Sequence, residues 1–148
     1  MTPSLEADPH NLQRFIDAQD AVIFHVRDEL LAGRKTGHWM WYIFPQIDGL
    51  GSSATAREFA ISSLTEAKAY LAHPLLATRI RECSELVNEI EGCPIDQIFH
   101  FPDNVKFQSS MTLFAHATTE NSVFLAAIQK YFSGKFDEST LRRIGSDG

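Results

Sequence analysis

The clearest periodicity in the chain lies in residues 74–90, which read PLLATRIRECSELVNEI. Proline at the start suits the first turn of a helix, where a missing N–H breaks no hydrogen bond. Apolar side chains then recur every three or four residues, as on the buried face of a helix: Leu76, Ile80, Cys83, Val87 and Ile90. The stretch predicts a long amphipathic helix that stops at Gly92, with Cys83 as a buried, inert thiol.

Two more helices are expected upstream of it. Asp8-Pro9 places a capping carboxylate before a helix-starting proline, and apolar residues follow at helical spacing until Gly33. Ser63-Leu64-Thr65-Glu66 fits a capping box, in which the hydroxyl and the carboxylate both accept hydrogen bonds from free backbone N–H groups. That helix should stop at His73, because the residue before a proline disfavours helical conformation.

Downstream, Pro94 begins a short turn that runs to Phe99, and three helix starts follow. They lie at Pro102-Asp103, at Asn121 or Ser122, and at Asp137. Residues 33–61 differ, because aromatics and glycines crowd there without periodicity, and a short strand or ordered loop is expected around residues 39–44. The fold class is therefore mainly α, as one compact domain over residues 9–144, with a disordered segment 1–8 and frayed residues 145–148.

Bulk composition narrows the classes of function. A chain of 148 residues with 44% hydrophobic and 22% charged residues is long and apolar enough to bury a core without metal or disulfide support. The net charge of −6 disfavours extended nucleic-acid binding, which relies on many lysine and arginine contacts. With no apolar run long enough for a membrane span and no signal-like start, we expect a cytoplasmic protein, monomeric or a small homo-oligomer.

Standard catalytic spacings are missing from the sequence. There is no nucleophile elbow, phosphate-binding P-loop or zinc-binding His-Glu-x-x-His motif. The six histidines are scattered and the two cysteines lack a partner pair, so we expect no metal and no cofactor.

The segment from Arg34 to Gln46 is the first candidate for a binding surface. It reads RKTGHWMWYIFPQ and holds both tryptophans of the chain, together with Lys35, His38 and Gln46. As a strand it would place Trp39, Trp41 and Ile43 on one face and Met40, Tyr42 and Phe44 on the other. Aromatic faces stack on planar bases, and Gln46 or His38 is suited to read a base edge. The plainer interpretation is that these aromatics are simply core.

Two further segments carry weaker signals. Gly49-Leu50-Gly51-Ser52-Ser53 offers backbone N–H groups to an anion, or is a plain turn. On a helix that begins near Asp103, Phe107 and its apolar neighbours face the core. Lys106, Ser109 and Ser110 then project along a neighbouring edge that suits a phosphate or sugar hydroxyls, although an exposed lysine with two helix serines explains the same pattern.

At these segments the sequence resembles a bacterial family, the domain of unknown function 1810, which is often mislabelled calpastatin. The resemblance spans about residues 10–144. It is carried by the strings His-Trp-Met-Trp at residues 38–41 and Ser-Ser-Met-Thr-Leu-Phe at residues 109–114, with weaker matches between and after them. Calpastatin itself is a disordered chain, whereas this composition is that of a packed core.

The family is in turn remotely similar to the YbiA-like, or NADAR, superfamily of compact helical proteins. Members of that superfamily cleave N-glycosidic bonds in ADP-ribosylated guanine or aminopyrimidine ribotides. The resemblance therefore implies an N-glycosidase (a hydrolase) acting on a ribosylated or ADP-ribosylated base or nucleotide. The superfamily's glycosidases carry a Glu-His pair after the aromatic segment, where this chain has Glu58-Phe59.

Such a reaction needs a carboxylate to stabilise the positive charge that develops on the sugar, and an acid for the departing base. The candidates are Asp103 and Glu58, with Glu66 ranked lower because its capping role explains it, and His38 as the acid. Ligand contacts would come from a larger set: Lys35, Trp39, Trp41, Gln46, Lys106, Ser109 and Ser110. Two alternatives stand beside this one, a non-catalytic module that binds ADP-ribose or another nucleotide, and a protein-interaction domain with an exposed aromatic patch.

Overall fold

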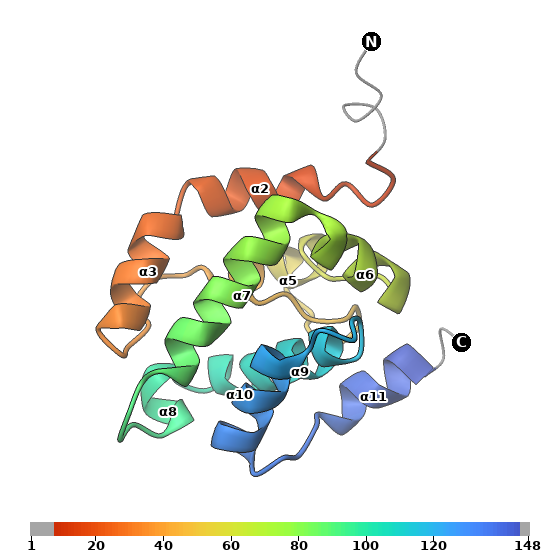
Figure 1. Ribbon diagram of the computed structural model, residues 1–148. Helices are drawn as coiled ribbons and strands as arrows, with labels where there is room; N and C mark the ends of the chain where they lie inside the picture. The colour runs from red at the N-terminus through yellow and green to blue at the C-terminus, as the bar shows by residue number, and fades with distance from the viewer. Residues whose placement is uncertain (1–7, 146–148) are drawn as a thin grey trace.

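The structure, a computed structural model, describes residues 8–145, and these residues form ten helices and no sheet. The helices are α2 Gln13–Asp20, α3 Ile23–Leu31, α4 Met40–Ile43, α5 Ala54–Glu58, α6 Leu64–Ala72, α7 Pro74–Asn88, α8 Ile95–Ile98, α9 Asp103–Ala115, α10 Ser122–Phe132 and α11 Glu138–Gly145 (Figure 1). The mainly α, single compact domain is thereby confirmed. The predicted disordered and frayed ends, apart from Asp8 and Gly145, lie outside the described residues.

Helix α7 is the centre of the packing. It contacts α2, α3, α4, α6 and α10, and Figure 1 shows it crossing the front of the molecule between the other helices. Four residues of its predicted apolar stripe are fully buried: Leu76, Ile80, Cys83 and Val87. Burial raises the pKa of the Cys83 thiol to about 12, so at neutral pH this cysteine is a protonated core residue, as the sequence indicated.

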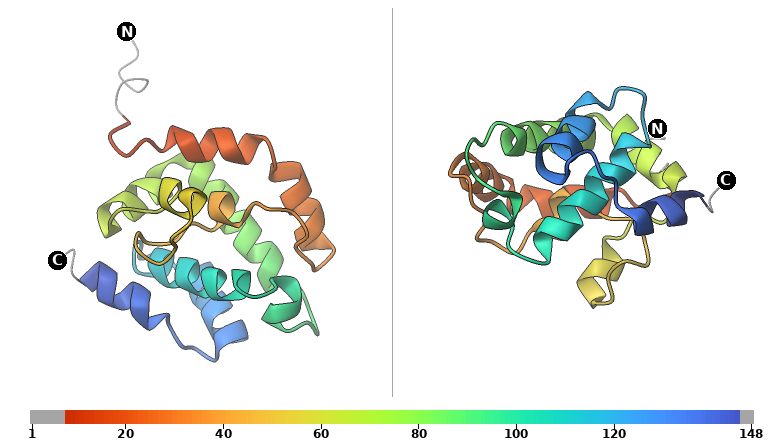
Figure 2. Two further views of the ribbon diagram at one scale, coloured as in Figure 1. Left: turned by 180° about the vertical axis from the view of Figure 1, so that it is seen from behind. Right: turned by 90° about the horizontal axis from the view of Figure 1, so that it is seen from below.

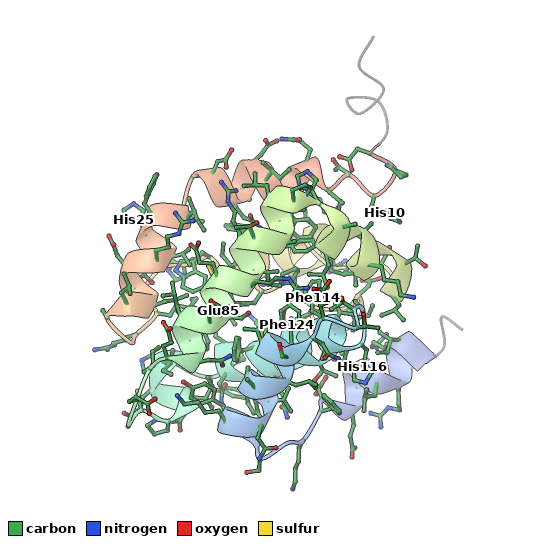
Figure 3. The ribbon with its side chains drawn as sticks, viewed as in Figure 1. His10, His25, Glu85, Phe114, His116 and Phe124 are labelled. Atoms are coloured by element: carbon green, nitrogen blue, oxygen red, sulfur yellow. The ribbon has the colours of Figure 1, made fainter. Side chains whose placement is uncertain are left out.

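Helix α9 forms the second half of the core. Phe107, Met111 and Phe114 have no exposed surface, as their spacing predicted. The Phe114 ring lies 6.0 Å from Phe124 of α10 and 5.1 Å from Tyr70 of α6, measured between ring centroids. Figure 3 shows Phe114 and Phe124 in the layer between α9 and α10. Helix α9 is therefore held by α6 on one side and α10 on the other.

The single N-terminal helix predicted for residues 9–33 was wrong, because the structure has two shorter helices there, α2 and α3. Asp8 does cap, but through a preceding turn: its carboxylate accepts hydrogen bonds from the N–H of Leu12 (2.7 Å) and of Gln13 (3.0 Å). Helix α2 consequently starts at Gln13. Val22 leaves helical conformation between α2 and α3, and both helices contact α7 on either side of this break.

The strand or loop expected around residues 39–44 is a helical turn, α4, so the predicted pair of strand faces was wrong. The buried side chains are spaced as on a helix: Trp39, Met40, Ile43 and Phe44. Trp41 and Tyr42 remain partly exposed. Extended pairing occurs just beyond the turn, at a single parallel bridge between Ile47 and Ile61. The core selects helical spacing because α4 packs against α2 and α7 rather than against a neighbouring strand.

The capping box predicted at the start of α6 is half formed. Ser63 Oγ accepts a hydrogen bond from the Glu66 N–H at 3.1 Å, as expected. The Glu66 carboxylate instead accepts hydrogen bonds from the Ser62 N–H (2.9 Å) and hydroxyl (2.7 Å), and pairs with Arg14 at 3.0 Å. Glu66 is thus a buried structural carboxylate and not part of a site.

The remaining helix starts agree with the sequence. Asp137 caps α11 by accepting a hydrogen bond from the Thr140 N–H at 3.0 Å, and α9 begins at Asp103. Within residues 8–145, no helix combines the length and hydrophobicity needed to cross a membrane.

Candidate functional site

Two lysines and one carboxylate meet at the start of α9. Lys35, in the segment after α3, places its ammonium 2.7 Å from Asp103 Oδ2 and 2.5 Å from the Gly37 carbonyl oxygen. Lys106, one turn along α9, lies 3.5 Å from Asp103 Oδ1. The Lys35 side chain is only 9% exposed, against 20% for Lys106. Lys35 is therefore held firmly, whereas Lys106 is held loosely at the surface.

Lys106 also covers Trp41. Its ammonium lies 4.7 Å from the centroid of the Trp41 ring, which is cation–π distance. The Trp41 Nε1 atom is buried without a hydrogen-bond partner. A buried N–H without a partner is unfavourable by about 1–3 kcal/mol, so it marks a place where a further polar group is suited to bind.

A small hollow opens beside these two side chains, and we call it the Trp41 hollow. Its lining comes from α4 and the residues after it, from the α5 region and from α9: Met40, Trp41, Phe44, Pro45, Gln46, Ile47, Gly51, Ala56, Phe59, Ala60 and Lys106. It holds about 300 Å³ counting its open mouth. Its closed interior leaves room for about one water molecule. A planar ring therefore enters only if the covering residues move.

Trp39, two residues earlier, is built into the core instead. Its Nε1 donates a hydrogen bond of 2.9 Å to Glu29 Oε1, which also accepts from the N–H of Thr36 (2.6 Å) and of Gly37 (2.9 Å). Burial raises the pKa of Glu29, but the hydrogen bonds from Gly37, Thr36 and Trp39 outweigh it and leave that pKa below its ordinary value. Glu29 is thus an ionised anchor for the segment that carries Lys35.

Lys106 is the cationic group that the site offers to a ligand. Two ammonium groups face Asp103, and the ionised Glu29 accepts a hydrogen bond from the Gly37 N–H beside Lys35, so the formal charges of these four groups balance. Lys106 is the more exposed of the two ammonium groups. Within the described part of the chain, no group of three or more histidine, cysteine, aspartate or glutamate side chains is arranged to hold a metal ion.

Comparison of this chain with known proteins identifies a matching family. The family model described as "Protein of unknown function (DUF1810)" matches residues 9–144. This chain belongs to the DUF1810 family. It is similar to a solved structure, that of the conserved hypothetical protein Rv1873 from Mycobacterium tuberculosis, with 51% sequence identity and a TM-score of 0.92. The similarity covers 93% of this chain and 99% of that one. A search of curated proteins found no match.

In this DUF1810 protein, the fold brings together five of the residues proposed from sequence. Lys35, Asp103 and Lys106 form the charged cluster, and Trp41 and Gln46 line the hollow that Lys106 closes. The residue content of the two segments had already marked them as candidates, and the structure shows that the segments are neighbours in space.

Other proposed residues lie elsewhere. Ser109 and Ser110 do not project along an exposed edge, because they are 2% and 0% exposed. Ser109 donates hydrogen bonds to the Val105 carbonyl (3.1 Å) and to Asp137 (3.2 Å), whereas Ser110 Oγ is buried without a partner. The edge expected from spacing alone is covered by the segment that leads into α11.

Three more candidates are not members of the charged cluster, although the Trp39 ring lies 5.2 Å from the Lys35 ammonium. Trp39 is 1% exposed and serves the core, so the plainer of the two interpretations holds for it. His38 is exposed beside it, and Glu58 is exposed at the end of α5, where its carbonyl oxygen accepts a hydrogen bond of 2.8 Å from Arg14. Of the four aromatic side chains in residues 34–46, Trp39 and Phe44 are buried, whereas Trp41 and Tyr42 are partly exposed.

Sequence reasoning missed two parts of the site. Glu29 was not singled out, because nothing in the sequence identifies the backbone N–H group, seven residues later, that its carboxylate binds. The position of Ala56 and Phe59 in the wall of the hollow was also missed. Gly51 beside them was named only as part of a loop that either offers N–H groups to an anion or is a plain turn.

Proposed function

We propose that the protein binds a small nucleotide-like ligand, such as a ribosylated or ADP-ribosylated base, at the Trp41 hollow. The observation that carries this proposal is the pairing of Trp41 with Lys106. A partly exposed indole ring, with an unpartnered buried N–H, lies under the ammonium of Lys106, whose ion pair with Asp103 is 3.5 Å long.

The binding mode follows from these contacts. A planar base stacks on the Trp41 ring in the place where the Lys106 ammonium lies. Such stacking contributes roughly 1–3 kcal/mol to the free energy of binding. The displaced Lys106 pairs with the phosphate of the ligand, while Lys35 keeps Asp103 in position. Gln46, at the wall of the hollow, has both a donor and an acceptor for the edge of the base.

The first test is calorimetric titration with ADP-ribose, AMP and adenosine as probes. We expect Lys106→Gln to weaken ADP-ribose binding about tenfold, the size of a lost charge-assisted hydrogen bond, and adenosine to bind more weakly than AMP. Lys135→Gln is the matched control, because Lys135 lines a separate groove beside α11. Equal affinities for the wild type and Lys106→Gln would remove Lys106 from the proposed site.

Cleavage of the N-glycosidic bond is the second candidate function, and Asp103 is the observation that favours it. Its carboxylate is joined to the lysine that covers the hollow, so it lies beside the place where the sugar of a stacked base would be. A carboxylate there stabilises the positive charge that develops on the ribose as the C–N bond breaks. Asp103 also has a plain structural role, as an acidic residue in the first turn of α9.

Released base separates the two candidates. The protein is incubated with ADP-ribosylated guanine and aminopyrimidine ribotides, and the products are resolved by chromatography with mass detection. A glycosidase predicts release that Asp103→Asn abolishes and that the exposed control Asp28→Asn leaves intact. Binding without release from any substrate would assign the protein to the non-catalytic class.

A further inference from the structure

One wall of the Trp41 hollow is a segment that packs loosely on the rest of the molecule. Residues 48–60, which we call the flap, contain α5, and no residue of α5 is buried. Figure 2 shows α5 projecting from the body in the view from below. Four flap residues nevertheless line the hollow: Gly51, Ala56, Phe59 and Ala60. The least buried helix of the site is therefore also the one that closes it.

The two ends of the flap are fixed. At the parallel bridge, the Ile61 N–H donates to the Gln46 carbonyl and the Asp48 N–H donates to the Ile61 carbonyl, both at 2.8 Å. Arg14 adds a third attachment, because its guanidinium donates to the carbonyl oxygens of Glu58 (2.8 Å) and Ala60 (2.9 Å). Movement of the flap is thus confined to the residues between these attachments.

Near the N-terminal end of the flap, Gly49 contacts Arg143 of α11. Gly49 has φ +96°, and a Cβ atom added there would lie 2.2 Å from Arg143 Nη1 and 2.5 Å from Arg143 Cζ. The guanidinium of Arg143, on α11, therefore lies directly on the Gly49 backbone. The positive φ favours glycine at this position, and a Cβ atom there would push the Arg143 guanidinium away.

We propose that Arg143 is a positioning residue that latches the flap over Trp41, and that the flap swings away to admit a planar ligand. The second half of this inference rests on the proposed function, whereas the latch itself does not. The motion follows from the size of the hollow, whose interior has room for about one water molecule and not for a base. The proposed swing would separate Gly49 from the Arg143 guanidinium, so this contact biases the flap toward the closed arrangement.

Amide hydrogen exchange followed by NMR tests the latch without any ligand. The reporters are the N–H groups of Arg57 and Phe59, which donate to the carbonyls of Ser53 (3.0 Å) and Thr55 (3.1 Å) within the flap. Arg143→Ala should accelerate their exchange up to about fivefold, the size expected for an exposed guanidinium contact. The Ala67 N–H of α6 is the reference for the rest of the fold.

Arg142→Ala is the matched control variant, because Arg142 is the adjacent arginine of α11 but lines the separate groove. Faster exchange at Arg57 and Phe59 in Arg143→Ala alone, with Ala67 unchanged, is the expected result. Unchanged flap amides in Arg143→Ala would overturn the latch. Equal acceleration of all three amides would also overturn it, because the change would then be global.

The gating role is tested by the association rate of ADP-ribose, measured by stopped-flow tryptophan fluorescence. Arg143→Ala should raise this rate by the same factor as it raises flap exchange. Faster exchange with an unchanged association rate would overturn the gate and keep the latch. If ADP-ribose does not bind at all, the proposed function fails, and the exchange experiment still decides the latch.

Discussion

Trp39 and Trp41 are separated by one residue, and a lysine ammonium lies over the ring of each. Trp39 nevertheless belongs to the core, whereas Trp41 lines the hollow. The Lys35 ammonium lies 5.2 Å from the Trp39 ring centroid, and Lys106 lies 4.7 Å from that of Trp41. Trp39 is buried with its N–H bound to Glu29, whereas Trp41 is partly exposed and its N–H has no partner.

The difference shows how one helical turn divides a segment between the core and the rim of the hollow. The turn α4 directs Trp39 inward with Met40, Ile43 and Phe44, and leaves Trp41 on the rim. Trp39, whose N–H is hydrogen-bonded, lies beneath the firmly held Lys35. Trp41, whose N–H has no partner, is the residue at which we propose that a ligand binds.

The largest expected contrast is in stability. Trp39→Ala should lower the free energy of unfolding by about 3–5 kcal/mol, because it empties a fully buried site. Trp41→Ala should lower it by about 1 kcal/mol, since the ring is partly exposed. Urea denaturation measures both. Equal losses would show that Trp41 is also a core residue and would break the comparison.

Substitution of the two lysines should affect stability in the same order as substitution of the two tryptophans, with the larger loss at the more buried residue. Lys35→Met removes the closer partner of Asp103 and is expected to destabilise the fold by about 2 kcal/mol, the usual effect of leaving a mostly buried charged group without its partner. Lys106→Met should stay within about 1 kcal/mol, because the more exposed pair contributes little. Thermal denaturation of the two variants is the measurement, and a reversed order would contradict the assignment of Lys35 as the firmly held residue.

Glu29, which accepts a hydrogen bond from Trp39, should make the stability of the protein depend on pH. Its folded pKa lies below its ordinary value of 4.5, so its contribution to stability is present above that pH and is lost as the pH falls through the folded pKa. The wild type should therefore be more stable than Glu29→Gln at pH 7, and the difference should disappear in acid. A constant difference across this range would show that charge is not the cause. Urea unfolding at a series of pH values provides the comparison.

The smallest perturbation uses the two indoles themselves as reporters. Acrylamide should quench the fluorescence of Trp41 and spare that of Trp39, with no change in the fold. Trp41→Phe, in which only Trp39 emits, should therefore show the lower quenching constant. Quenching of the same size in Trp41→Phe and in the wild type would mean that Trp41 is sealed from solvent.

Most of the helices could be predicted from sequence, because their signals are local. The stripe of α7, the proline at its start and the Asp137 cap of α11 depend on residues that are near one another in the chain. The errors arose where distant packing decides. The break in the N-terminal helix and the turn at Trp39 both follow from contacts with α7, which no local pattern reports.

The site was predictable in part for the same reason. Lys106 and Trp41 were found from the residue content of their two segments, and the structure adds the contact between them. Burial of Ser109 was not foreseeable from spacing, because it depends on Asp137 arriving from 28 residues away. Glu29 binds two backbone N–H groups besides the Trp39 side chain, and backbone partners leave no trace in residue identities.

The parallel bridge at Ile47 and Ile61 closes residues 48–60 at their base with two hydrogen bonds of 2.8 Å. Contacts of Gly49, Glu58 and Phe59 tie both sides of this loop to the body, whereas its tip, residues 52–54, is exposed. Doubling the length of a closed loop costs only about 0.6 kcal/mol. A peptide or a fluorescent probe inserted at this tip should therefore be tolerated better than at any helix that contacts α7.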